Sequence, residues 1–377
     1  MLKSKIYKIS GVLILIGILG GCIWYWQLPN RHKAIVKSFL FEKLGVVDKD
    51  WKVNNQAETY KMISPEFYID GIYKSMEGPK SSNYVQVSQD STLLWLTGFE
   101  VKALDANSLK PASKDFICHT NIDFNDVKYY SSFHLEKRIG SQYPRLTSLS
   151  HGMENFSFPK GYGVPMKGNE LLYVTTESLN HNLPNANFWI RHEVDIHYSK
   201  EKNVKPLMSR TAFIMLPYDK FDPNKSPTDP GTNQCIPVET KNHSYDDGKG
   251  NKLSGHWVIP TGKKTYRSSV TAQLQIQDSL RLHAAAIHVH PFATSISLVD
   301  KTTGKPIFTS KIINHTKTVG LTKIEPFTSE EGIWLYKDHE YEIVLEVNNT
   351  TSSDQDMMGS MFLFFYDKEL DDLLSKH

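Results

Sequence analysis

The chain of 377 residues is long enough for two or three globular domains and has the composition of a packed protein. Apolar residues make up 40% and charged residues 22% of it, which excludes a disordered chain, a coiled coil and collagen. Its 43 basic and 41 acidic residues give a net charge of +2, so we expect no nucleic-acid partner. Three cysteines are too few for a disulfide framework, whereas the 15 histidines make some of them candidate metal ligands.

The N-terminal segment, residues 1–30, predicts a membrane tether. Three lysines precede an uncharged run from Ile9 to Asn30, which as a helix rising ~1.5 Å per residue would be about 33 Å long and would cross a bilayer core of ~30 Å. The basic flank predicts a cytoplasmic N-terminus and a globular part in the periplasm or outside the cell. Two forms of tether remain open. The segment is an uncleaved transmembrane signal anchor, or Leu19-Gly20-Gly21-Cys22 is a lipobox and Cys22 carries a lipid.

The rest of the chain predicts an all-β protein. Residues 31–61 have the pattern of a stalk with a short amphipathic helix at Ala34–Leu44, and from Phe67 onward short runs alternate between apolar and polar residues, as in half-buried antiparallel strands. The clearest runs are Tyr84–Val87, Leu93–Gly98, Leu171–Thr176, Phe188–His197, Ala212–Leu216, Val270–Ile276, Thr294–Val299 and Tyr341–Val347.

Many short strands without intervening helices favour two consecutive antiparallel β-sandwich domains of the jelly-roll type. We place the N-terminal domain at residues 62–203, the C-terminal domain at residues 204–368 and a tail at residues 369–377. The polar stretch Asp222–Gly255 is expected to be a long surface loop of the second domain.

The sharpest local feature is Ile287-His288-Val289-His290. On a strand, residues i and i+2 face the same side, so His288 and His290 project together at the spacing of two metal ligands. The alternative is a pair of hydrogen-bonded surface histidines. No carboxylate follows within a few residues, which weakens a site of two histidines and one carboxylate. A second feature is Asp356-Met357-Met358 at the entry of an apolar strand, where a methionine is either core filler or a soft ligand for Cu(I).

Six motifs in one order resemble the copper type II, ascorbate-dependent monooxygenases, the family of peptidylglycine α-hydroxylating and dopamine β-monooxygenases. The resemblance covers roughly residues 90–367. The motifs are Trp95–Glu100, Ile117-Cys118-His119-Thr120, Phe158–Gly163, Trp257–Gly262, His288-Val289-His290 and Asp356-Met357. The resemblance implies two jelly-roll domains that each hold one copper, with a solvent cleft between them.

The resemblance also implies the ligands. His288, His290 and Met357 match the copper ligands of the C-terminal domain, and Met358 is the fallback if the strand slips by one residue. The N-terminal copper is doubtful, because Cys118 stands where the family has the first of two adjacent histidines and Leu179 falls at the third ligand position. Its remaining candidates are Cys118, His119 and His181. A Cys118–Cys235 disulfide would remove Cys118 from that set.

We therefore expect one tightly held copper per chain. The other histidines, including His151 and His256, are expected at the surface or in capping positions. At the positions that clamp a peptide carboxylate in the family this chain has Ala286, Gly359 and Met361, so glycine-extended peptides are not expected to be substrates.

Three functions remain open on the sequence. The first is a membrane-tethered, exported copper monooxygenase that hydroxylates a C–H bond with O2 and a one-electron donor such as ascorbate. The second is a non-catalytic copper-binding protein that keeps one Cu(I) site on the same fold. The third is a module resembling a bacterial glycan amidase of the same architecture, which no pair of carboxylates in matching motifs supports.

Overall fold

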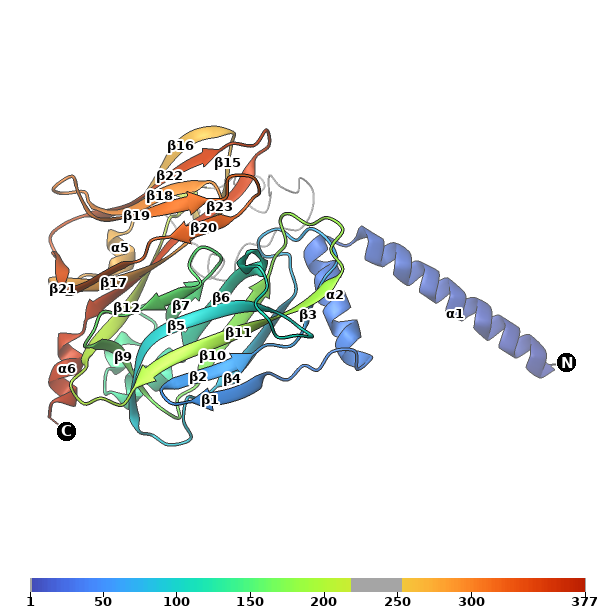
Figure 1. Cartoon of the computed structure of the whole chain (residues 1–377), viewed down its shortest axis with the longest axis horizontal. Coiled ribbons are helices and arrows are strands. Elements are labelled where there is room, and N and C mark those ends of the chain that lie inside the picture. The colour runs from blue at the N-terminus through green and yellow to red at the C-terminus, as the bar shows by residue number, and fades with distance from the viewer. Residues whose placement is uncertain (1, 218–252, 377) are drawn as a thin grey trace.

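The computed structural model describes residues 2–217 and 253–376. Two helices, α1 (Leu2–Gln27) and α2 (Asn30–Lys43), precede a body that consists mostly of antiparallel strands. The predicted all-β class is therefore confirmed. Figure 1 shows the later strands, in orange and red, lying against the earlier strands, in cyan and green, while α1 extends away from both.

The first half of the body covers residues 52–203. Its strands are β1 (Lys52–Gln56), β2 (Thr59–Ile63), β3 (Phe67–Ile69), β4 (Lys80–Val85), β5 (Leu93–Asp105), β6 (Ile117–Phe124), β7 (Arg145–Leu149), β8 (Asn155–Ser157), β9 (Tyr162–Lys167), β10 (Leu172–Ser178) and β11 (Phe188–Ser199). Its short helices are η1 (Lys114–Phe116), α3 (Asp126–Ser132) and η2 (Glu136–Arg138).

The second half covers residues 204–374, apart from the segment 218–252. Its strands are β12 (Lys205–Phe213), β13 (Leu216–Pro217), β14 (Leu253–Ser254), β15 (His256–Ile259), β16 (Gly262–Ser269), β17 (Leu280–Val289), β18 (Ala293–Asp300), β19 (Lys305–Asn314), β20 (Leu321–Ile324), β21 (Phe327–Leu335), β22 (Tyr341–Asn349) and β23 (Gln355–Tyr366). Its helices are α5 (Thr271–Leu274) and α6 (Lys368–Leu374).

One sheet runs through both halves in the order β1-β2-β11-β5-β9-β12-β23-β17-β21. The halves meet where β9 and β12 pair in parallel, with Lys205 opposite Tyr162 and Pro206 opposite Gly163. A second sheet, β4-β10-β6-β7, belongs to the first half, and a third, β16-β22-β18-β19-β20, belongs to the second half. Buried side chains of all three sheets form a continuous core.

The strands that carry the H-x-H and Asp-Met-Met motifs lie inside this arrangement. β17 and β23 pair with each other and are buried along nearly their whole length. Strands covered on both faces are expected to be almost continuously apolar rather than alternating, and Ala284-Ala285-Ala286-Ile287 and Met361–Phe365 have that composition. Polar side chains on these two strands are therefore placed in the interior of the protein.

The structure corrects two expectations about local structure. Val270–Ile276, expected to be a strand, contains the short helix α5, whose residue Gln273 bonds the backbone N–H and C=O of Phe213 through its side-chain amide. Residues 52–61, expected to lie in the stalk, form β1 and the first part of β2 in the large sheet. Most of the expected loop Asp222–Gly255 lies outside the described residues, as does Cys235.

Helix α2 packs on the first half instead of forming a free stalk. The Phe41 ring lies 5.6 Å from that of Tyr68 and 5.2 Å from that of Trp189, and Lys37 pairs with Asp70 at 2.5 Å. The apolar N-terminal segment is helical, as predicted. Within residues 2–217 and 253–376, no helix combines the length and the apolar character that crossing a membrane requires.

Candidate metal centre

The two histidines of the H-x-H motif are buried, not exposed. His288 lies near the end of β17 opposite Ser360 of β23, and His290 follows the last residue of the strand. Their side chains lie near each other, with ring centroids 5.6 Å apart, and the residues are 8% and 4% exposed. The alternative of a surface pair is therefore wrong. Burial lowers the pKa of His288 well below its ordinary value, and the neighbouring imidazoles of His290 and His119 lower it further. A neutral imidazole is the form that binds a metal.

A carboxylate and a third imidazole join His290. Asp356 Oδ2 lies 2.9 Å from His290 Nδ1 and 3.4 Å from His256 Nε2, and all three ligand atoms lie within 4.8 Å of one another. Atoms that bind one ion at ~2.0–2.2 Å with angles of about 90–110° are separated by ~2.8–3.6 Å. The contact between His290 and Asp356 has the length of an ion pair, but its direction is not that of a hydrogen bond. The separations of 2.9 Å and 3.4 Å from Asp356 Oδ2 to the two imidazole nitrogens fall in this range.

The charge state of Asp356 suits this role. Burial by itself would raise the pKa of this carboxyl, but the neighbouring imidazoles of His290 and His256 outweigh burial and hold the pKa well below its usual range. Asp356 is therefore ionised at neutral pH. A carboxylate between two imidazoles is a hard anionic ligand beside two borderline ones, the combination that first-row divalent metals accept.

His256 and Asp356 come together through strand pairing that the sequence does not display. β15 begins at His256 and runs antiparallel to the entry of β23, with His256 opposite Met358 and Val258 opposite Asp356. His256, expected at the surface or in a capping position, is instead partly buried beside Asp356, which the sequence marked only as part of a motif. The alternation of side chains along a strand could have identified Asp356. Asp356 lies two residues before Met358 and four before Ser360, so all three share one face of β23.

The same alternation separates the two methionines. Ser360 is opposite His288, so Met358 lies on the face of β23 that carries Asp356 and Ser360, while Met357 lies on the other face. Met357 is fully buried in the hydrophobic core, and Met358 lines a cavity together with His288 and His119. The structure therefore does not bring Met357 to His288 and His290; it brings the fallback, Met358.

His119 of β6 lies close to this group, although it belongs to the first half. Its ring centroid is 6.3 Å from that of His288, and its Nδ1 lies 3.3 Å from the sulfur of Cys118. The register of β6 against β10 shifts between Glu177 and Ser178, which is a bulge at Cys118. Burial raises the pKa of the Cys118 thiol well above its ordinary value, and Glu177 raises it further. Cys118 is a free cysteine in this structure, and its raised pKa favours the protonated thiol.

His181 is not paired with His119 but with His151, at a ring-centroid distance of 6.3 Å. His151 Nδ1 lies 3.0 Å from the carbonyl oxygen of Ile117, so it donates its proton there and presents the Nε2 lone pair. Neither His151 Nε2 nor His181 Nδ1 has a hydrogen-bond partner in the described part of the chain. Burial lowers the pKa of both imidazoles to about 4, and the neighbouring His151 also lowers the pKa of His181. His151, expected at the surface, is therefore a buried member of this group.

We refer to His119, His151, His181, His256, His288, His290, Asp356 and Met358 as the histidine cluster. Other histidines have ordinary structural partners. His192 contacts Thr176 Oγ1 at 2.6 Å and the carbonyl oxygen of Phe116 at 3.2 Å, and His339 contacts Asp300 at 2.7 Å. The cluster thus differs from these histidines in having several buried ring nitrogens without a hydrogen-bond partner among the described residues.

No family model matches this chain, and no curated protein matches it. Among solved structures it is similar to an N-glycanase F (PNGase F), with 8% identity, coverage of 82% of this chain and 96% of that chain, and a TM-score of 0.33. A glycosylasparaginase PNGase F from Flavobacterium meningosepticum gives 10% identity, 83% and 96% coverage and a TM-score of 0.30. The major capsid protein P2 from bacteriophage PM2 is 9% identical, with coverage of 81% of this chain and 99% of that chain and a TM-score of 0.29. Likenesses of this size carry no information on activity, and the resemblance to copper monooxygenases stays a prediction.

Proposed function

We propose that this chain is a copper protein of the monooxygenase type, built as two consecutive jelly-roll domains with a metal held by ligands of the second. The observation that supports the proposal is the convergence of His256, His290 and Asp356 on one point, at separations that suit ligands of one ion. These ligands come from three strands or strand ends far apart in the sequence, and burying a carboxylate among imidazoles needs a compensating charge. A bound cation provides that charge.

The donor set fits copper. Imidazole suits copper, zinc, iron and nickel, and of the divalent first-row metals Cu²⁺ binds a given nitrogen and oxygen site most tightly. Copper bound there would supply one-electron redox chemistry and activation of O2. The residues of the chain hold the imidazoles in position and exclude bulk water, because His288 and His290 are buried. Iron is the alternative to copper at this site, since two histidines and one carboxylate are the ligands of many non-haem iron oxygenases.

We propose that the substrate binds in a cavity whose lining includes sequence neighbours of two cluster histidines. It has a volume of about 600 Å³ and is lined by Phe292, two residues after His290, and by Asn182, one residue after His181. Phe292 has a φ of 77°, which is rare for an aromatic residue, and its backbone N–H donates to Asn314 Oδ1 at 2.6 Å. A backbone held in such a conformation beside a metal ligand supports a role in binding, and we place the hydroxylated C–H bond of the substrate at this side of the cluster.

The second candidate function is a copper-binding protein without catalysis. The burial of the ligands favours it, because the cavity that His288 itself lines has a volume of only about 30 Å³. Oxygen consumption distinguishes the two functions, since only the enzyme couples oxidation of ascorbate or another one-electron donor to O2 uptake.

We also propose that the protein is exported and attached to a membrane by its N-terminal segment. The support is the exposure of apolar side chains along α1, such as Leu13 at 64% and Ile14 at 63%, in a helix that projects from the body (Figure 1). Either this segment or a lipid on Cys22 provides the attachment. Fractionation of cells that express the full chain and its Cys22→Ser variant tests this, because a lipid anchor requires Cys22 and a helical anchor does not.

The metal proposal is tested by measuring the metal content and affinity of the full chain after loading with copper, iron or zinc in competition. We expect copper to be retained, and Asp356→Asn to weaken its binding by about a hundredfold because the anionic ligand is lost. Asp300→Asn is the matched control, since Asp300 contacts His339 at 2.7 Å outside the cluster. Equal copper affinity in both variants would refute the site, and preferential retention of iron would favour the iron alternative.

A further inference from the structure

The side of α2 that faces away from the body of the protein is apolar. The inner side packs on the first half, where Lys37 pairs with Asp70 and the Phe41 ring meets that of Tyr68. The large apolar side chains exposed on the rest of the helix and just beyond it are Ile35, Phe39, Leu40, Leu44 and Val46. We propose that this set, the outer face of α2, binds the surface of a phospholipid membrane and fixes the body against it. Such binding adds a second contact to the proposed membrane attachment, on which it rests.

The pattern of α2 is the reverse of that of an ordinary surface helix. A helix on a globular body normally buries its apolar side chains and turns its charged ones to water. In α2 the charged Lys37 lies on the inner side, whereas Phe39 is 54% and Leu40 is 47% exposed. Ile35 and Phe39 are four residues apart and so are neighbours on the helix surface. An exposed apolar surface of this kind gains free energy when it leaves water, and it is typical of a binding surface.

The position of α2 in the chain favours a membrane as the partner. Helix α1 ends at Gln27 and α2 begins at Asn30, a separation that extended chain spans with at most ~11 Å. The headgroup layer on each side of a bilayer core is about 5–8 Å thick. With α1 across the bilayer, α2 therefore begins in or directly beside the headgroups. A lipid on Cys22 leads to the same position, because Cys22 is within about 8 Å of Gln27 along α1.

The basic side chains of α2 complement the charge of lipid phosphates. They are Arg31, Lys33, Lys37 and Lys43, whereas Glu42 is the single acidic residue of the helix. Lys43 Nζ lies 5.5 Å from the centre of the Phe39 ring, so a cation stands beside the outer face. A lysine in that place can bury its methylene groups against lipid and hold its ammonium group among the phosphates. Trp24 and Trp26, exposed at the end of α1, are of the residue type enriched at this depth of a membrane.

Phe39 and Trp334 provide a matched pair of variants. Each is an exposed aromatic residue with a basic group over its ring, Lys43 Nζ at 5.5 Å in one and the guanidinium carbon of Arg281 at 4.6 Å in the other. Trp334 belongs to β21, at the end of the body away from α2 (Figure 1). Phe39→Ser and Trp334→Ser both change exposed side chains, so both variants are expected to fold, which their melting temperatures check. Only Phe39→Ser should weaken the contact with lipid.

The test is photolabelling of the full chain in liposomes of phosphatidylcholine and phosphatidylglycerol that contain a phospholipid with a diazirine high on its acyl chain. Mass spectrometry of peptides then locates the lipid adducts. We expect adducts on residues 35–40 of α2 as well as on α1, and none on β21. Phe39→Ser should lower the labelling of α2 by about tenfold, the factor that corresponds to removing one large apolar side chain from the membrane, and leave that of α1 unchanged. Trp334→Ser should change neither.

The outcomes separate this contact from the membrane attachment itself. Adducts on α1 alone would overturn the contact and leave the attachment standing, and adducts on neither helix would contradict both. Equal labelling of α2 in Phe39→Ser and in the unmodified chain would also overturn the contact, because the tether by itself would then bring α2 to the lipid. Chemical cross-links between copies through α2, without lipid adducts there, would assign the face to a second copy of the chain and overturn it too.

Discussion

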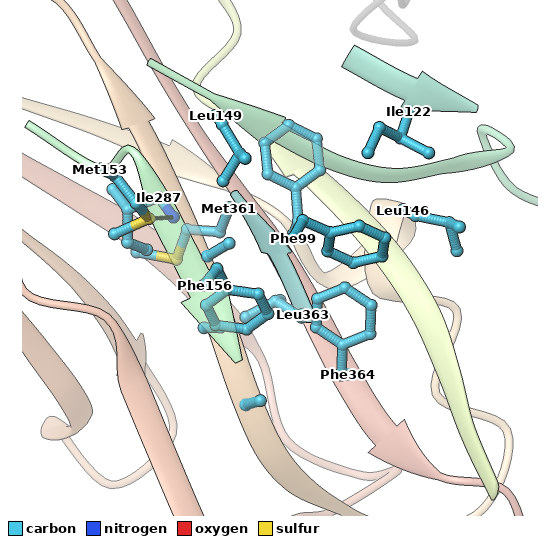
Figure 2. Close-up of a cluster of buried hydrophobic side chains, with 14 of the residues drawn as sticks. Phe99, Ile122, Leu146, Leu149, Met153, Phe156, Ile287, Met361, Leu363 and Phe364 are labelled. Atoms are coloured by element: carbon cyan, nitrogen blue, oxygen red, sulfur yellow. Dashed lines mark hydrogen bonds between the residues drawn. The ribbon is translucent and has the colours of Figure 1, made fainter. Parts of the chain in front are cut away.

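Two buried regions join the halves of this protein, and they differ in how their polar groups are satisfied. In the first, shown in Figure 2, apolar side chains from both halves pack together, and the rings of Phe156 and Phe364 stack at 5.7 Å. In the second, the histidine cluster, the buried ring nitrogens His151 Nε2, His181 Nδ1, His288 Nδ1 and His290 Nδ1 make no hydrogen bond within the described chain.

Unsatisfied buried polar groups are rare in native proteins and each costs about 1–3 kcal/mol. The apolar region is therefore expected to stabilise the fold, and the histidine cluster to weaken it until a metal binds. Mutations can therefore separate the two regions. Substitutions in the apolar region should change the stability of the metal-free protein, and substitutions in the histidine cluster should change the stability that bound metal adds.

The largest expected effect is in the apolar region. Phe364 is fully buried and its ring also lies 4.6 Å from that of Phe158, so Phe364→Ala leaves a large cavity between the halves. We expect the free energy of unfolding to fall by about 3–5 kcal/mol, measured by urea denaturation of the metal-free protein. Trp334→Ala, at a residue that is 43% exposed, is the control and should change it by much less. A small loss in Phe364→Ala would show that this region does not hold the halves together.

The next effect is the stabilisation that metal adds. Copper at a hundredfold excess over its dissociation constant should raise the free energy of unfolding by about 2.7 kcal/mol per site, because it binds the folded state. Thermal unfolding with and without copper measures this gain. In Asp356→Asn we expect most of the gain of that site to disappear, because the anionic ligand is lost. An unchanged gain with copper would contradict this.

The third effect is acid sensitivity, and it is tested at His192, away from the cluster. Burial lowers the pKa of His192 to about 4 from an ordinary value of 6.5. Between these two values the unfolded chain binds the proton that the folded chain does not, so stability is retained above pH 6.5 and falls as the pH drops toward 4. The slope is roughly 1.4 kcal/mol per pH unit at most for this residue. Urea denaturation of His192→Gln at pH 7 and pH 5 should show a smaller drop than the unmodified protein, and an equal drop would contradict it.

The smallest effect is expected at the pair His339 and Asp300, which has the same two side-chain types as His290 and Asp356. Its histidine side chain is 25% exposed, and solvated ion pairs contribute about 0–1 kcal/mol. His339→Asn should therefore change the free energy of unfolding by less than 1 kcal/mol and leave copper affinity unchanged. A change in copper affinity would show that a His–Asp contact outside the cluster is also a metal site.

The sequence predicted the elements that depend on local pattern. Every run named from its alternation except Val270–Ile276 overlaps a strand, and the spacing of His288 and His290 predicted neighbouring side chains. It did not identify α5, because Val270–Ile276 has the apolar content of a strand and its helix is held by a distant contact from Gln273 to Phe213. It also did not identify residues 52–61 as part of the large sheet.

The candidate site was predicted only in part, for a related reason. The face on which Asp356, Met357 and Met358 lie is set by the register of β23 against β15 and β17, and a shift of one residue exchanges the two methionines. His151 and His256 reach the cluster through pairing and packing of segments far apart in the chain, and no local motif marks either residue. The ligands that the family resemblance implied thus include His288 and His290 but neither His256 nor Asp356.

The most direct test of the metal centre compares the copper affinity of His256→Ala with that of Met357→Leu in the full chain. The structure places His256 Nε2 3.4 Å from Asp356 Oδ2 and Met357 in the hydrophobic core. We predict that His256→Ala weakens the copper site at Asp356 by a hundredfold or more, while Met357→Leu leaves copper binding unchanged. Unchanged affinity in His256→Ala together with a large loss in Met357→Leu would contradict this centre and restore the ligand set His288, His290 and Met357.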